Sequence, residues 1–176
     1  MSPPYSTPDA QSPGQPAQNS VQSVRVLKII TFAMVMGVLV FMGVTLAMSQ
    51  GAIDGDPNVM SWIGIGMGVL MGVNHLVVPN IVAGIALNNV NVETLQNADD
   101  MMKFSLIYPA FQTRHIVACG MLEAAAFMNL VFYMLTSYAG NLAAAGVLVV
   151  MIALRFPSVS AVEFWVQDRV REIELR

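Results

Sequence analysis

The stretch "ACGMLEAAAFMNLVFYML", residues 118–135, carries one acid, Glu123, in an otherwise apolar run that has the length of a membrane helix. A helix needs about 20 mainly apolar residues to cross a bilayer, because the hydrocarbon core is about 30 Å thick. The run therefore predicts a transmembrane helix over about residues 110–135. Ionising a carboxyl group inside such a helix is costly, so Glu123 is the first candidate for a functional residue.

The composition of the whole chain also favours a membrane protein. Of its 176 residues, 56% are hydrophobic and only 11% are charged, and the mean hydropathy is +0.63. A soluble domain carries about 25% charged residues, so this chain lacks the polar surface to face water on all sides. The net charge of −3 gives no reason to expect a nucleic-acid partner. A single cysteine, Cys119, excludes a framework of intramolecular disulfides.

Three further apolar segments, residues 26–49, 60–87 and 142–156, complete a predicted all-α bundle of four transmembrane helices. The loops after the first and third of these helices contain no basic residue. All eight basic residues therefore fall on one side of the bundle, and the positive-inside rule assigns that side to the cytoplasm. We expect a multi-pass protein of the bacterial inner membrane with both termini in the cytoplasm. The basic residues are Arg25, Lys28, Lys103, Arg114, Arg155, Arg169, Arg171 and Arg176.

This threading divides the chain into three parts. Residues 1–24 are rich in Pro, Ser and Gln and are predicted to be a disordered cytoplasmic tail. Residues 25–157 form the transmembrane domain, and residues 158–176 form an amphipathic helix.

The amphipathic helix begins after Pro157, where Ser160 and Glu163 fit a capping box. Its apolar face has two interpretations with equal support. It is an interfacial helix with Trp165 near the lipid headgroups, or a helix packed on the loop of its own chain over residues 88–109.

Glu123 needs a partner, or a neutral form, at its predicted depth. It follows Arg114 by about nine residues, or roughly 13 Å along a helix, which is close to the bilayer midplane. The leading partner is His75, predicted within one or two turns of the same depth, and Asn74 and Asn129 are other polar groups that can join a network. In one interpretation, a protonated Glu123 hydrogen-bonds across the bundle and fixes helix register. In the other, it is a proton or cation site.

Glycines at a spacing of four mark the second predicted helix. Gly64, Gly68 and Gly72 lie on one stripe, which lets another helix approach closely. That helix belongs to the same chain or to a second copy. The fourteen methionines are better explained by flexible packing than by metal transport, because no Cys/His cluster accompanies them. We therefore predict no metal and no cofactor.

Two families have related motifs. Over residues 111–166 the chain resembles a family of small four-helix bacterial membrane proteins of unknown function. Its opening helix resembles "VLKIITFAMVMGVLVF", residues 26–41. The resemblance implies the fold and supplies no activity. The motifs that carry it are Phe111-Gln112-Thr113, Arg114, Met121-Leu122-Glu123, the turn from Thr136 to Asn141, and Pro157.

A weaker similarity is to subunit c, the proteolipid of the rotary ATP synthase. In that family a glycine-rich helix is followed by a helix with an ion-binding carboxylate, and the resemblance implies that role for Glu123. The matching residues are Gly64, Gly66 and Gly68, then Glu123-Ala124, Ala126 and Leu130-Val131.

No catalytic triad, two-histidine metal spacing or phosphate-binding loop occurs in the sequence, so we do not predict an enzyme. The first functional hypothesis is a non-enzymatic membrane protein whose bundle packs, assembles or scaffolds. Its partners are the lipid bilayer and either further copies or other membrane subunits. The alternative is translocation of protons or cations by Glu123.

Overall fold

The computed structural model describes residues 15–175, with side chains from Val21 onward. This part of the chain is helical and contains no strand, which confirms the all-α class. Three of its helices, α1, α2 and α4, are long and apolar enough to cross a membrane, which indicates a membrane protein. The helices are α1 (Gln15–Met48), α2 (Val59–Asn88), α3 (Val92–Gln96), α4 (Asp100–Thr136), α5 (Ala139–Ala153) and α6 (Val159–Glu174).

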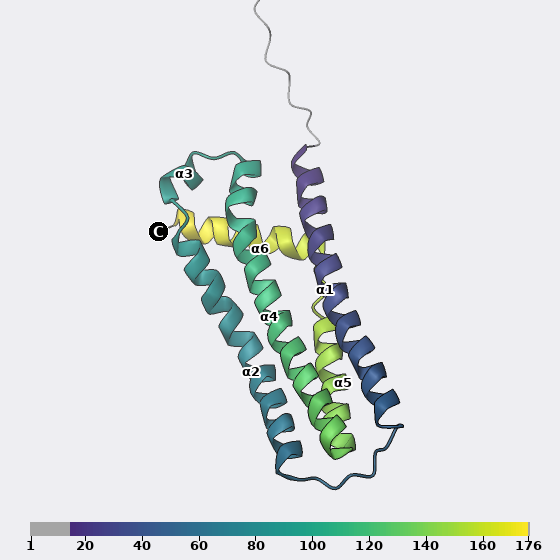
Figure 1. Cartoon of the computed structure of the whole chain (residues 1–176). Helices are drawn as coiled ribbons and strands as arrows, with labels where there is room; N and C mark the ends of the chain where they lie inside the picture. Colours follow the sequence, from purple (N-terminus) through teal and green to yellow (C-terminus); the bar gives the residue numbers. More distant parts are fainter. Residues whose placement is uncertain (1–14, 176) are drawn as a thin grey trace, which may run out of the picture.

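Helix α4 is the hub of the bundle. It contacts α1, α2, α5 and α6, and the first three run alongside it (Figure 1). In the most apolar window of α4, 44% of the residues are buried, against 17% in α1 and in α2. Large apolar side chains therefore remain exposed along α1 and α2. In a bilayer these faces are suited to contact lipid.

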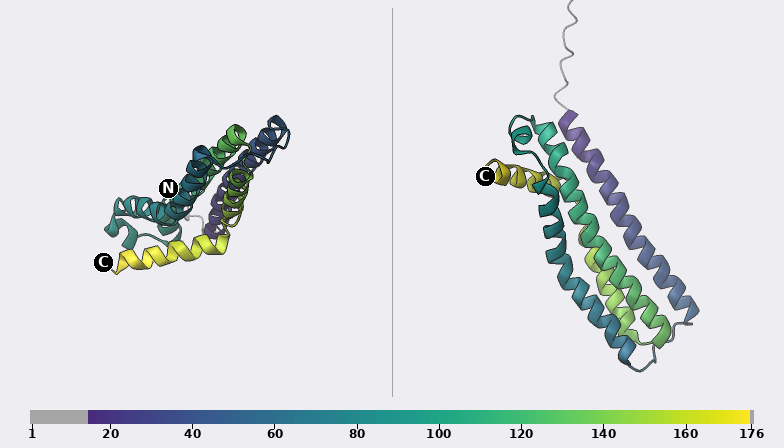
Figure 2. Two further views of the ribbon diagram at one scale, coloured as in Figure 1. Left: turned by 90° about the horizontal axis from the view of Figure 1, so that it is seen from below. Right: turned by 60° about the vertical axis from the view of Figure 1, so that its left-hand side comes forward.

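Helix α6 lies across the bundle instead of along it (Figure 2). Its apolar face packs against α1, α3 and α4 in a cluster that includes Val24, Leu95, Phe111 and Val162. A second cluster around Leu122, Leu130 and Leu148, among others, joins α1, α4 and α5. The structure thus packs α6 on its own chain, on the loop helix α3 as well as on α1 and α4.

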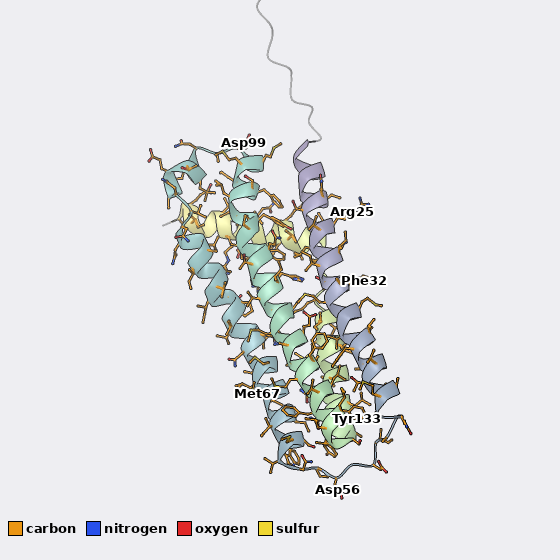
Figure 3. The ribbon with its side chains drawn as sticks, in the orientation of Figure 1. Arg25, Phe32, Asp56, Met67, Asp99 and Tyr133 are labelled. Carbon is orange, nitrogen blue, oxygen red and sulfur yellow. The ribbon has the colours of Figure 1, made fainter. Side chains whose placement is uncertain are left out.

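The two loops without basic residues meet at one end of the molecule. Asp54 pairs with Tyr138 across an isolated bridge, and the backbone N–H of Gly55 donates to the carbonyl of Ser137 at 3.2 Å. The hydroxyl of Tyr133 donates to the carbonyl of Ala52 at 2.6 Å. Figure 3 shows Asp56 and Tyr133 at this end, and Arg25 and Asp99 towards the other.

Several boundaries differ from the sequence prediction. Helix α1 begins at Gln15, so residues 15–24 are helical, and the prediction of a disordered tail to residue 24 is wrong for them. Val24, at the end of this stretch, is buried in the cluster that packs against α6. The rest of that prediction, residues 1–14, lies outside the described residues.

The start of α4 was also predicted too late. It begins at Asp100 instead of about residue 110, because Asp99 caps it: its carboxylate accepts from the backbone N–H of Met102 at 2.8 Å. The capping box at Ser160 and Glu163 is wrong as well. The cap of α6 is Ser158, whose hydroxyl accepts from the backbone N–H of Ala161 at 3.2 Å.

Candidate functional site

Glu123 lies in the middle of α4, on the face that packs against α1. Its Oε1 would be 3.6 Å from a Cβ atom placed on Gly37, an ordinary van der Waals distance, so the carboxyl group faces this glycine of α1. The ring of Phe127, one turn further along α4, faces the same glycine at 3.9 Å. Glu123 is half-buried and forms no hydrogen bond within the described part of the chain.

The predicted pair of Glu123 with His75 is not formed. His75 is buried on α2, and its Nδ1 donates to the carbonyl of Gly72 in its own helix. Both α1 and α2 pack on α4, and Glu123 faces α1. Asn74 is half-buried and has no hydrogen bond among the described residues. Glu123, His75 and Asn74 therefore do not form one hydrogen-bond network, although similar depths were predicted for Glu123 and His75.

Asn129 enters a different network, which links three helices. Its Oδ1 accepts from Nδ2 of Asn141 in α5 at 3.2 Å, and its own Nδ2 donates to the carbonyl of Ala125 at 2.9 Å. Nδ2 of Asn141 also donates to the carbonyl of Ser61 in α2 at 3.2 Å. All three polar residues, Asn129, Asn141 and Ser61, are fully buried. The amide network therefore ties α2, α4 and α5 together.

Two of the three stripe glycines pack against this network. A Cβ atom on Gly64 would lie 2.6 Å from the ring of Phe132, and one on Gly68 would lie 3.0 Å from Nδ2 of Asn129. A side chain at either position would therefore displace α4 or its asparagine. Gly72 differs from the prediction, because nothing in the described structure lies within 4 Å of a Cβ atom placed there. The close approach thus involves helices of the same chain and ends at Gly68.

A second buried polar cluster, between α1 and α4, was missed from the sequence. Nε2 of His115 lies 2.8 Å from Oγ1 of Thr31, which itself donates to the carbonyl of Leu27 at 2.9 Å. Because the hydroxyl proton goes to Leu27, Nε2 of His115 is the donor to Thr31. Sγ of Cys119 is 3.6 Å from the same nitrogen. The sequence pattern that could have revealed this cluster is the spacing of four between His115 and Cys119, which places both on one face of α4.

The chemistry of these clusters is that of interhelical contacts. Within residues 15–175 no three His, Cys, Asp or Glu side chains are grouped so that they could hold a metal ion. The buried amides and the histidine–threonine pair each join two or more helices. Glu123 is the exception, since it faces a neighbouring helix without a hydrogen bond.

The fold thus combines three helices that are long and apolar enough to cross a membrane with polar contacts between helices. No protein-family model, curated protein or solved structure matches the chain. The resemblances to the four-helix family and to subunit c stay predictions.

Proposed function

We propose that this protein is a non-enzymatic, multi-pass protein of the bacterial inner membrane whose bundle serves packing, assembly or scaffolding. The observation that carries the proposal is the amide network of Asn129, Asn141 and Ser61, together with the close approach at Gly64 and Gly68. Polar groups between membrane helices stabilise a defined helix arrangement. Here the amides of Asn129 and Asn141 bond to one another and to backbone carbonyls of α4 and α2.

The proposed threading has α5 as the fourth transmembrane helix and both termini in the cytoplasm. Helix α5 has 15 residues, or about 22 Å at 1.5 Å per residue, which is shorter than the bilayer core. Arg155 follows it and can snorkel, and the bilayer can thin locally. The loops tied together by Asp54 and Tyr138 are the two without basic residues, so one end of the bundle is free of positive charge.

The packing role is tested by Asn141→Ala, with Asn74→Ala as the matched control. Removing the Asn141 amide leaves Oδ1 of Asn129 and the carbonyl of Ser61 without their donor, so we expect a loss of about 1–2 kcal/mol in the free energy of unfolding. Asn74→Ala removes an amide that has no hydrogen bond among the described residues. Thermal unfolding in mild detergent measures both variants. Equal stability of the two would contradict the structural role of the network.

Assembly is tested by native gel electrophoresis of membranes solubilised in mild detergent. A scaffold is expected to migrate as a homo-oligomer or with other membrane subunits. Migration as a monomer in every mild detergent would leave only a packing role for the bundle.

The second candidate function is translocation of protons or cations by Glu123, as the resemblance to subunit c implies. The observation that favours it is a carboxyl group in mid-helix that faces Gly37 without a hydrogen bond. Proteoliposomes with the parent protein and with Glu123→Gln distinguish the two functions. Translocation predicts a proton flux that the variant loses. The scaffold predicts no flux above that of empty liposomes.

A further inference from the structure

Two arginines from different helices lie beside Trp165, and a third is near enough to one of them to act on its charge. Arg114 comes from α4, Arg155 from the turn after α5, and Arg169 from α6. The guanidinium groups of Arg114 and Arg169 lie 5.9 Å and 5.6 Å from the centre of the Trp165 ring. Arg155 and Arg169 are near enough to Arg114 for their charges to act on it repulsively. This convergence of like charge is unfavourable unless an anion offsets it.

The acids of the described chain offset this charge only in part. Arg169 is ion-paired with Glu172 on its own helix, and the other recorded ion pair within residues 15–175 joins Lys103 to Glu174. Neither Arg114 nor Arg155 takes part in either pair. Nε of Arg169 is buried and has no hydrogen-bond partner in the described structure. The cluster therefore holds three positive charges close together and one unused donor.

A cavity of about 270 Å³ adjoins the cluster. It lies between the last turns of α2, the segment after them and α6, and it is lined by Asn80, Leu87, Trp165, Arg169 and Glu172, among others. One arginine of the cluster is hydrogen-bonded to a residue that lines the cavity: Nε of Arg114 donates to Oδ1 of Asn80 at 2.8 Å.

The apolar surface beside the cavity continues along α2. Three apolar side chains of the same part of α2 are 53–60% exposed: Val77, Ile81 and Ile85. An acyl chain can lie on this face while a charged headgroup reaches the arginines. A freely diffusing anion would gain nothing from the apolar face.

We propose that the Arg114–Arg155–Arg169 cluster and the adjoining cavity bind the phosphate of an anionic phospholipid from the leaflet on the α6 side. Basic pockets between membrane helices are suited to such headgroups, because guanidinium groups form paired hydrogen bonds to phosphate oxygens. Trp165 holds two of the guanidiniums, and its ring is of the kind that settles at the headgroup level. The proposal rests on the membrane threading but not on the scaffold role.

Native mass spectrometry of the detergent-solubilised full chain tests this site. The protein is titrated with phosphatidylglycerol, with phosphatidylcholine and with inorganic phosphate. We expect phosphatidylglycerol to bind more tightly than phosphatidylcholine, and we expect inorganic phosphate not to displace it. Equal affinity for the two lipids would overturn the charge recognition. Displacement by inorganic phosphate would show that the ligand is the free anion.

Arg155→Gln and Arg171→Gln are the matched variants. Both remove one positive charge from the α6 region, but Arg171 lies on the exposed face of α6 and lines a different groove. We expect Arg155→Gln to weaken phosphatidylglycerol binding roughly fivefold and the triple Gln variant of the cluster to weaken it on the order of a hundredfold. Arg171→Gln is expected to leave it unchanged. The Arg155 side chain makes no recorded hydrogen bond or ion pair among the described residues, so its single variant remains informative even if the triple variant does not fold. Equal effects of the two single variants would overturn the proposal.

Discussion

At the scale of single residues, Glu123 and Asn129 show two ways of placing a polar side chain inside an apolar helix. They lie six positions apart in α4 but face different neighbours. Asn129 accepts a hydrogen bond from Asn141 of α5, and Asn141 also donates to the carbonyl of Ser61 in α2. Glu123 instead faces a glycine of α1. The Asn129 amide is bonded through both its oxygen and its nitrogen, whereas the carboxyl group of Glu123 forms no hydrogen bond among the described residues.

We predict that Glu123 is mainly protonated at neutral pH. The low dielectric of the bilayer disfavours the carboxylate, and no cationic partner is recorded for Glu123 among the described residues. A protonated carboxyl group in lipid reacts with a hydrophobic carbodiimide, so we expect labelling at pH 6 that Glu123→Gln abolishes. Asp56, in the loop between α1 and α2, serves as the control acid outside the helices. Absence of label at Glu123 would mean a carboxylate that is charged and solvated.

At the scale of helices, the glycines of α2 divide into those in contact and those that face open space. Gly64 and Gly68 allow α2 to approach α4 and α5, and Gly72 does not take part. The same helix thus carries a test residue and its control, four positions apart.

We expect Gly68→Leu to lower stability by about 1–3 kcal/mol, because the added side chain must displace Asn129 or separate the helices. Gly72→Leu adds the same side chain where nothing lies within 4 Å and should leave stability nearly unchanged. Thermal unfolding in detergent compares the two. If both variants lose the same stability, the leucine acts through its helix propensity and not through packing.

Hydropathy predicted where the long apolar helices lie but not how each is rotated. Helix α2 was placed within one residue at each end, since a run of apolar residues has limits that can be read from the sequence. The pairing of Glu123 with His75 rested on depth, and depth leaves the direction of a side chain around its helix undefined. The start of α4 was missed because its first turns, capped by Asp99 and packed near α6, are less apolar than a membrane segment. Asn141 was not among the predicted site residues, although it is buried in the amide network.

At the scale of the whole molecule, the end of the bundle that carries α6 holds the positive charge. Arg25 and Lys28 lie in α1 on this side, and α6 packs on that part of α1 through Val24 and Leu27. The opposite end is closed by the contact of Asp54 with Tyr138. Because α1, α2, α4 and α5 pack together and their loops meet at that end, one orientation would apply to all four helices.

Reporter fusions determine the orientation of the molecule in the membrane and whether α5 crosses the bilayer. Because basic segments are retained in the cytoplasm, we expect fusions after Pro16, Asp99 and Arg176 to report the cytoplasm, and fusions after Asp56 and Tyr138 to report the periplasm. Tyr138 and Arg176 flank α5 and α6, so opposite signals from these two positions show that α5 crosses the bilayer despite its 15 residues. Equal signals would remove the fourth crossing. They would also conflict with the packing of α6 on the start of α1, which holds only if α5 returns the chain to that side. A periplasmic signal from either terminus would reverse the orientation and, with it, the leaflet from which the arginine cluster draws its lipid.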